Sequence, residues 1–421
     1  MQPPTTSSSV YVSISSSISD SGKKEEMSKV KIISTSHVKP GKMIGRKECQ
    51  LVTFDLPYLA FYYNQKLLFY KCGEFEAKVE KLKDGLRVVL EEFYQIAGKL
   101  GKDEDGVFRV EYDDDMDGVE VVEATAMEIG IEELATEDGT ASFKDLIPYT
   151  GVLNLEGLHR PLLSVQVTKL KDGVAMGCAF NHAILDGTST WHFMSSWAQI
   201  CSGSNSVSVS PFLERTKVRN TRVKLDLSLP PNPVNGDANQ GPQLREKLFR
   251  FSEAAIDKIK SKVNSTPPSD SYCRKRVDPP MPESYFGNLI HAIFTVTAAG
   301  LLLASPPQFG ASLVQKAIEA HNAKAIEERN KEWEAAPKIF EYKDAGVNCV
   351  AVGSSPRFKV YDVDFGWGKP EGVRSGSNNR FDGMVYLYQG KSGGRSIDVE
   401  IALEAGALEK LQKDKAFVLE V

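Results

Sequence analysis

The sequence lacks the features that mark membrane-spanning, disulfide-bonded and metal-binding proteins. A membrane helix needs about 20 consecutive apolar residues, and the nearest run here, 298–304, contains a glycine and ends at Ser305-Pro306-Pro307. The six cysteines and six histidines are dispersed, and no C-x-x-C pair is present. This distribution indicates reduced thiols in a cytosolic protein and predicts neither a metal centre nor a permanently bound cofactor.

Positive charge is also in short supply. The 51 Lys and Arg residues are outnumbered by 56 Asp and Glu residues, which gives a formal net charge of −5. Nucleic-acid-binding domains favour a basic surface, so the charge argues against a nucleic-acid partner. Hydrophobic residues at 41% and charged residues at 25% are typical of a soluble globular protein. The 421 residues suit two or three domains of about 100–200 residues each.

Two segments are predicted to lie outside the folded lobes. Residues 1–27 are rich in serine and contain the charged run Lys23-Lys24-Glu25-Glu26, so we expect a disordered tail. A plastid transit peptide is the alternative that the serines suggest, but the segment contains no arginine. Residues 204–246 begin with serines and continue into Leu229-Pro230-Pro231-Asn232-Pro233. This composition predicts a long crossover linker with little regular structure.

Residues 28–203 are predicted to form an N-terminal lobe of strands and helices. Residues 163–168 alternate apolar and polar side chains, as expected for a strand with one exposed face. Residues 174–180 are continuously apolar and predict a buried strand, after which apolar residues recur at helical spacing over 191–198. A long amphipathic helix is predicted from a further set of helically spaced apolar residues: Phe75, Val79, Leu82, Leu86, Val89, Leu90, Phe93 and Ile96.

Residues 247–421 are predicted to form a C-terminal lobe of the same kind. Ser252 is a suitable cap for its first helix. Both halves of the chain mix strands with helices, which indicates an α/β protein of two similar lobes. We expect strands at 247–251, 287–297, 349–353, 384–389 and 397–403, and helices at 252–263, 311–335 and 404–413.

The segment Asn181-His182-Ala183-Ile184-Leu185-Asp186-Gly187 follows the buried strand and precedes a predicted helix. His182 therefore lies in a turn from which a side chain can reach a cleft. A neutral imidazole accepts a proton from an alcohol or amine near neutral pH. Asp186 either orients that imidazole, as in a charge relay, or pairs with an arginine and fixes the turn. On its own, the pattern also fits an ordinary core or capping histidine.

A second segment, Asp364-Phe365-Gly366-Trp367-Gly368, combines an acid with two aromatic residues and two glycines. On its own it is typical of a tight surface turn held by aromatic packing. In this order, and in opposite halves of the chain, the two motifs resemble those of the BAHD family of plant acyltransferases. The resemblance implies two chloramphenicol-acetyltransferase-like lobes of mixed sheet and helices with an active-site channel between them. It also implies a cytosolic enzyme that uses acyl-CoA as co-substrate and acylates a hydroxyl group.

The resemblance also implies roles for individual residues. His182 is the general base that deprotonates the acceptor hydroxyl for direct attack on the thioester. Asp186 pairs with Arg274 in a structural role, and Gly187 supplies flexibility to the turn. Residues 364–368 shape a loop outside the reaction centre.

Donors for the oxyanion and for coenzyme A are less closely specified. Many relatives have a tryptophan where this chain has Ser355, preceded by Ser354, so either hydroxyl is a candidate oxyanion donor. Lys369, Arg374 and Arg380 are candidates for contacts with the phosphates of coenzyme A. The alternative is that these three side chains are simply solvated. A further histidine, His192, is interpreted as a packed residue of the helix after the motif.

Three further segments, 51–66, 186–194 and 374–381, resemble members of the family that act on the route to the plant cuticle. This resemblance implies a hydroxy fatty acid or a related lipid alcohol as the acceptor. We expect a monomer whose partners are acyl-CoA and this hydroxylated acceptor.

One stretch departs from the family pattern. Relatives have a helix and a strand before the segment that matches 274–280, whereas this chain reaches it directly through 264–272. Two prolines within eight residues cannot replace a buried strand. We therefore expect an unpaired sheet edge or a cavity, lower stability, and an Arg274 displaced from Asp186. The alternative to an active enzyme is a catalytically impaired splice or gene-model variant that at most binds a ligand or partner.

Overall fold

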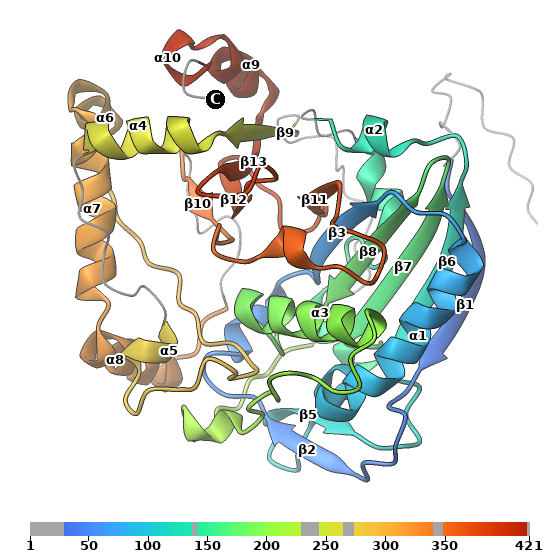
Figure 1. The fold of residues 1–421 in the computed structure, drawn as a ribbon. Coiled ribbons are helices and arrows are strands. Elements are labelled where there is room, and N and C mark those ends of the chain that lie inside the picture. The colour runs from blue at the N-terminus through green and yellow to red at the C-terminus, as the bar shows by residue number, and fades with distance from the viewer. Residues whose placement is uncertain (1–28, 137–140, 229–243, 264–272, 340–347, 419–421) are drawn as a thin grey trace, which may run out of the picture.

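A computed structural model of the protein describes residues 29–136, 141–228, 244–263, 273–339 and 348–418. These residues form a mixed α/β protein with a six-stranded, a four-stranded and a three-stranded sheet (Figure 1). The tail at 1–27, the proline-rich part of the linker at 229–243 and the shortened stretch at 264–272 lie outside the described residues. In the described ranges, no helix is both long and apolar enough to span a bilayer.

The six-stranded sheet positions the motif histidine at the end of one of its strands. Neighbouring strands are antiparallel except for one parallel pair, β6 (Val119–Ala126) and β7 (Leu163–Leu170). Helices α1 (Phe75–Glu92) and α3 (Gly187–Cys201) pack against each other over one face of this sheet (Figure 1). The strand order is β1 (Lys31–Val38), β6 (Val119–Ala126), β7 (Leu163–Leu170), β8 (Val174–Phe180), β3 (Asn64–Tyr70) and β11 (Gly372–Ser375).

Helix α1 forms with the buried face that its sequence predicts. All eight of its predicted core positions are buried, although the helix ends at Glu92 and a 3-10 turn, η2 (Tyr94–Ala97), completes the segment. The indole Nε1 of Trp197 in α3 donates to the carbonyl oxygen of Leu82 at 3.0 Å, which fastens α3 to α1. The buried strand at 174–180 is also confirmed, as β8.

Strand β7 differs from its prediction because both of its faces are buried. It is the third of six strands, and a second apolar cluster covers the face away from α1 and α3. In that cluster Phe143, Leu146 and Ile147 pack over the sheet, and Gln166 Nε2 donates to the carbonyl oxygen of Asp145 at 2.8 Å. The polar residues that alternate along β7 are therefore covered by the segment at 143–147. The sequence of β7 alone does not show that another segment packs there.

Strand β11 comes from the C-terminal half of the chain but pairs with β3 in the six-stranded sheet. Its four residues are too few for a periodic signal, so the sequence did not predict it. As a result, the two halves of the chain share one sheet next to the motif histidine.

The four-stranded sheet follows its prediction closely. Helix α4 (Glu253–Val263) and helices α9 (Ala405–Lys413) and α10 (Lys415–Val418) pack on it around Phe249 and Phe251. The hydroxyl of Ser252 accepts the backbone N–H of Ala255 at 3.2 Å, which confirms the predicted cap. The strand expected at 349–353 is reduced to two residues. The strand order is β10 (Ala351–Val352), β12 (Met384–Gln389), β13 (Ile397–Glu404) and β9 (Leu244–Phe251).

The remaining elements are short. The three-stranded sheet consists of β2 (Lys47–Gln50), β5 (Phe108–Tyr112) and β4 (Lys99–Lys102). The short α-helices are α2 (Ile131–Leu134), α5 (Cys273–Arg276) and α6 (Ala299–Ala304). The other 3-10 turns are η1 (Leu56–Ala60), η3 (Ala141–Leu146), η4 (Asn154–Leu158), η5 (Arg215–Lys217) and η7 (Val360–Asp362).

Two predictions for the C-terminal half are wrong. Residues 287–297 form no strand, and Phe294 and Val296 are 62% and 90% exposed. A strand needs a neighbour for its backbone groups, and none of the described strands pairs with this segment. The single helix expected over 311–335 is two helices, α7 (Pro307–Ala320) and α8 (Ala323–Ala335). The break occurs because the Asn322 side chain accepts the N–H of Ala325 at 3.1 Å and caps α8.

Candidate functional site

His182 lies in the turn that joins β8 to α3, as the sequence predicts. The side chain of Asn181 accepts the N–H of Ala183 at 3.1 Å, and its carbonyl accepts the N–H of Ile184 at 3.1 Å. Asp186 then caps α3 by accepting the N–H of Ser189 at 2.9 Å. The turn is therefore fixed at both ends by asparagine and aspartate side chains, which suit these positions because they bond readily to nearby backbone.

The backbone of His182 is held from two directions. Its N–H donates to Asn154 Oδ1 in η4 at 2.9 Å, and its carbonyl oxygen accepts Asn288 Nδ2 at 2.8 Å. The imidazole stacks on the ring of Tyr58 in η1, with centroids 4.4 Å apart and planes within 9° of parallel. Three segments that are distant in sequence thus fix the position of this one residue.

The surroundings of His182 favour its neutral form. Burial is the largest influence and lowers its pKa below the usual value of 6.5. Its own backbone, Asp186 and Asn288 have smaller, opposing effects on that pKa. The ring is therefore neutral at neutral pH, which is the form that accepts a proton. The residue as a whole is partly exposed, whereas its Nδ1 atom is buried and has no hydrogen-bond partner in the described part of the chain.

Both oxygens of Asp186 are occupied by groups other than His182. Arg274 Nη2 and Nη1 donate to Oδ1 and Oδ2 at 3.0 Å each, and the N–H groups of Ser189 and Leu289 donate at 2.9 and 3.2 Å. Burial, the largest influence, acts to raise the pKa of Asp186, but Arg274 and the backbone donors together hold that pKa below its usual value. This arrangement favours the structural interpretation of Asp186 over a charge relay.

The predicted displacement of Arg274 is wrong. Its guanidinium is buried against Asp186 and also donates to the carbonyl oxygen of Tyr285 at 3.1 Å. Arg274 is delivered by the short helix α5. The reason it stays in place is energetic, because a buried carboxylate that has lost its cation is strongly destabilised.

Gly187 is needed for a close approach. It is the first residue of α3, and a Cβ atom built there would lie 2.9 Å from Cε2 of Phe358. The structure thus gives a reason for this glycine that differs from the expected turn flexibility. The Phe358 ring also brings the segment with the candidate donors to the start of α3. In that segment the Ser355 hydroxyl accepts the N–H of Arg357 at 3.3 Å.

The second motif forms a nest of backbone donors around one carboxylate oxygen. Asp364 Oδ1 accepts the N–H groups of Gly366, Trp367 and Gly368 at 2.7, 2.9 and 2.9 Å. Gly366 and Gly368 have φ angles of 85° and 92°, which favour glycine. The rings of Phe365 and Trp367 pack edge-on against Tyr70, and Phe365 also packs against Trp197. The motif therefore fastens a C-terminal loop onto the N-terminal sheet and α3.

Two of the three residues considered for coenzyme A phosphates are directed inward. Arg374 is buried and donates to the carbonyl oxygen of Thr136 at 2.7 Å. Arg380 forms a buried ion pair with Glu400 at 2.5 Å. The hypothesis fails for both because their charges already have internal partners, whereas Lys369 is exposed and pairs with Asp362 at 3.1 Å.

His192 packs as the sequence predicts. Its ring meets Phe93 edge-on, and its Nε2 lies 2.9 Å from the carbonyl oxygen of Val209.

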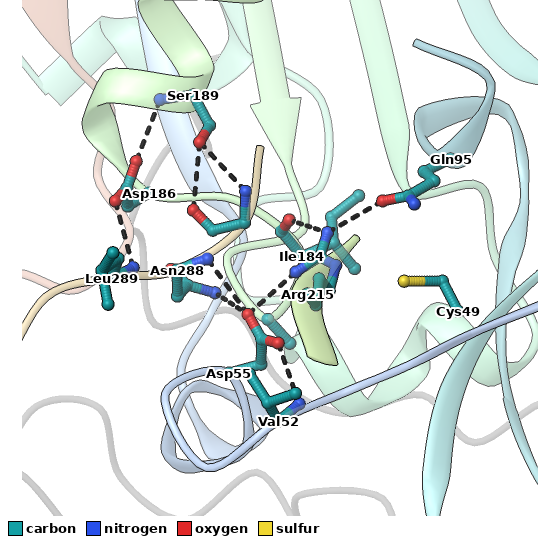
Figure 2. A network of polar contacts seen from close by, with 12 residues as sticks. Cys49, Val52, Asp55, Gln95, Ile184, Asp186, Ser189, Arg215, Asn288 and Leu289 are labelled. Carbon is teal, nitrogen blue, oxygen red and sulfur yellow. Dashed lines mark hydrogen bonds and ion pairs between the residues drawn. The ribbon is translucent and has the colours of Figure 1, made fainter. Parts of the chain in front are cut away.

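A buried polar cluster behind the motif turn was not predicted (Figure 2). Asp55 and Arg215 form an ion pair of 2.9 Å whose two side chains have no exposed surface. Arg215 Nη2 also donates to the carbonyl oxygen of Ile184 at 2.5 Å and to Gln95 Oε1 at 3.1 Å. The cluster therefore binds the turn at the carbonyl oxygen of Ile184, two residues after His182.

Asn288 completes this cluster. Its backbone N–H and its Nδ2 each donate to Asp55 Oδ1 at 3.1 Å (Figure 2). The same Nδ2 donates to the carbonyl oxygen of His182. The sequence carried no local signal for these residues. Arg215 lies in the predicted linker, and its partner Asp55 is 160 residues away.

Comparisons with known proteins agree with this fold. A sequence profile of the Transferase family matches residues 28–267 and 271–418. The chain is 60% identical over 448 aligned positions to BAHD acyltransferase DCR of Arabidopsis thaliana, with 93% of each protein covered. That alignment is longer than the 421 residues of this chain, so the relative has residues that this chain lacks. The profile match is interrupted within the shortened stretch.

Solved structures show the same architecture. Vinorine synthase superimposes with a TM-score of 0.68 at 18% identity, covering 90% of this chain and 96% of that chain. F. graminearum TRI101, complexed with coenzyme A and T-2 mycotoxin, superimposes with a TM-score of 0.69 at 17% identity, covering 89% and 98%. At such identities the likeness concerns the fold alone, and it confirms the fold class expected from the sequence.

Proposed function

The chain belongs to the BAHD family of acyltransferases, and from this premise we propose that it transfers an acyl group from acyl-CoA to the hydroxyl group of a lipid, with His182 as the general base. Membership of the family makes the protein an acyltransferase. The identity of the base, the acceptor and the course of the reaction are the substance of the proposal.

The observation that carries the proposal is the state of His182. The imidazole is held at its backbone by Asn154 and Asn288, is stacked on Tyr58, and has a pKa lowered chiefly by burial. A fixed, neutral and partly exposed imidazole is what proton abstraction from a hydroxyl group requires. Asp186, which a charge relay would need, is committed to Arg274 instead.

In the proposed reaction the acceptor hydroxyl gives its proton to Nε2 of His182 as its oxygen attacks the thioester carbonyl carbon. The carbon–oxygen bond forms while the carbonyl π electrons move to oxygen, which gives a tetrahedral oxyanion. The carbon–sulfur bond then breaks, and the thiolate takes the proton from the imidazolium. No covalent enzyme intermediate is needed because the thioester is already activated. The hydroxyls of Ser354 and Ser355 are the proposed donors to the oxyanion.

The proposed acceptor is a hydroxy fatty acid or a related lipid alcohol of the plant cuticle. Support comes from the 60% identity to BAHD acyltransferase DCR, and from the segments at 51–66, 186–194 and 374–381 that resemble cuticle-related members. Acyl-CoA is proposed as donor because a protein of the same fold, TRI101, is complexed with coenzyme A. We propose that the enzyme acts as a monomer in the cytosol.

A second candidate is a catalytically impaired variant that binds a ligand or partner. The observation that favours it is the segment at 287–297, which forms no strand in the described structure and exposes Phe294 and Val296. The retained ion pair of Arg274 with Asp186 weighs against it.

One assay separates the two candidates. Purified protein is incubated with a panel of acyl-CoA thioesters and hydroxy fatty acids, and free coenzyme A is followed with a thiol reagent while the ester is identified by mass spectrometry. A reaction with heat-denatured protein serves as the background control. Acceptor-dependent thiol release with ester formation supports the enzyme. If a folded preparation binds acyl-CoA but releases no thiol above that control with any acceptor, the second candidate is favoured.

A further inference from the structure

The side-chain amide of Asn288 has a determined orientation. Its Nδ2 donates to Asp55 Oδ1 at 3.1 Å and to the carbonyl oxygen of His182 at 2.8 Å. A backbone carbonyl is only an acceptor, and the Asp55 carboxylate accepts because Arg215 pairs with it at 2.9 Å. The nitrogen of the amide must therefore face these two groups, so the oxygen Oδ1 faces the other way.

Two buried polar atoms without partners in the described ranges belong to the two residues that the Nδ2 hydrogen bond joins, Asn288 and His182. Asn288 Oδ1 and His182 Nδ1 are both buried, and neither has a hydrogen-bond partner among the described residues. Buried polar atoms without partners are rare because each costs about 1–3 kcal/mol. One is an acceptor and the other can carry a proton, so each can satisfy the other. The Asn288 side chain also acts on the ring, since it raises the pKa of His182 against the larger lowering by burial.

We propose that Asn288 is the positioning residue for the base, with its Oδ1 accepting the N–H at Nδ1 of His182. This inference rests on the proposed function. The contact selects the neutral tautomer with the proton at Nδ1, which leaves the lone pair of Nε2 free for the acceptor hydroxyl. When the hydroxyl gives up its proton, that proton binds Nε2. The imidazolium then keeps its Nδ1–H on Asn288, and no proton passes to the amide.

The neighbouring side chains explain why an amide has this task. Asp186 is unavailable because four donors from Arg274, Ser189 and Leu289 occupy its two oxygens. Asp55 in turn holds Asn288 by two hydrogen bonds of 3.1 Å, and Arg215 holds Asp55. The tautomer of the base is thus set by residues outside the H-x-x-x-D motif, drawn from three distant parts of the chain.

The test is the protonation state of His182 in Asn288→Ala, followed by NMR of the full chain with ¹⁵N-labelled histidine. The His182 signals are assigned by their loss in His182→Asn. Wild-type protein is expected to show the Nδ1–H tautomer, and the variant is expected to lose that preference and to titrate at lower pH. Its kcat is expected to fall about tenfold, as for one lost hydrogen bond, with KM for acyl-CoA within about twofold.

Leu289→Ala is the matched control, because Leu289 is a fully buried neighbour whose side chain lies in an apolar cluster. It is expected to lower the Tm while leaving the His182 tautomer and titration as in wild type. A folded Asn288→Ala with an unchanged tautomer and midpoint overturns the inference. If that variant does not fold, Asn288→Ser gives the same two outcomes. An active His182→Ala would refute the proposed base, whereas the tautomer readout does not depend on activity.

Discussion

The guanidinium of Arg274 lies 3.0 Å from each carboxylate oxygen of Asp186, and both side chains are buried. The pair joins the turn that holds His182 to α5, in the second half of the chain. Asp186 also caps α3, so one carboxylate fixes the helix, the turn and the contact between the two halves. The position of His182 therefore depends on how the second half docks, although no C-terminal residue belongs to the motif itself.

Asp186→Asn is expected to destabilise the protein while leaving the chemistry of the folded form largely intact. The change leaves Arg274 buried without its counter-charge, which costs roughly 3–5 kcal/mol. Urea unfolding measures this loss, and turnover is compared at a temperature where the variant is folded. As a control, Asp84→Asn breaks an exposed pair with Arg87 at 3.8 Å and should cost less than about 1 kcal/mol. A stable but inactive Asp186→Asn would support a charge relay instead.

His182→Ala is expected to remain folded and to lower acyl transfer by at least about 10²-fold, the lower end for a lost general base. His182→Asn should behave alike, because it keeps polarity but cannot accept the proton. The readouts are thiol release and circular dichroism.

His192→Ala is the matched control for His182→Ala, since His192 lies on the following helix and contacts Phe93 and Val209. We expect its turnover to stay within a few-fold of wild type. Near-normal turnover in a folded His182→Ala protein would remove His182 from the role of base.

As the pH is lowered, the rate of acyl transfer is expected to fall at a lower pH than it would with a histidine of ordinary pKa. Burial lowers the pKa of His182 below 6.5, and a base is active in its deprotonated form, above its pKa. The acid limb of kcat/KM against pH should therefore have its midpoint below pH 6.5. An acid limb centred at or above that value would show that the imidazole is not the buried, neutral group found here.

The sequence predicted the parts of the fold that depend on local periodicity. Helix α1, strands β8, β12 and β13, and the position of His182 at the end of β8 follow from apolar spacing, which burial rewards directly. The segment 287–297 also has the apolar content of a strand, but it lacks a partner among the described strands. The apolar pattern of a segment shows which of its side chains can be buried. It does not show whether another strand lies beside the segment to pair with its backbone.

The candidate site divides in the same way. The motif residues His182 and Asp186 could be found because they follow one another along the chain. The cluster of Asp55, Arg215 and Asn288 could not, because it joins an N-terminal loop, the predicted linker and the second half. Within a polar linker, the local sequence around a buried arginine such as Arg215 does not differ from that around a solvated arginine.

The last prediction concerns the exposed apolar side chains of residues 294–303. Val296 and Leu303 are 90% and 87% exposed, and Phe294 also lies open on the same segment of chain. The alignment to BAHD acyltransferase DCR spans 448 positions, so that relative has residues that this chain lacks. Exposed apolar groups of this kind favour association. Val296→Lys is therefore expected to bind less of a hydrophobic fluorescent dye than wild type. It is also expected to associate less with rising protein concentration, as measured by light scattering.

The free energy of unfolding should change by less than about 0.5 kcal/mol in this variant, because the Val296 side chain buries little surface. Thr295→Lys adds the same charge at the neighbouring exposed position and removes no apolar side chain, so it isolates the effect of charge. If both variants suppress association equally, net charge is responsible and the apolar surface is not. If neither does, and wild type is monodisperse at high concentration, the exposed side chains of residues 294–303 do not drive association.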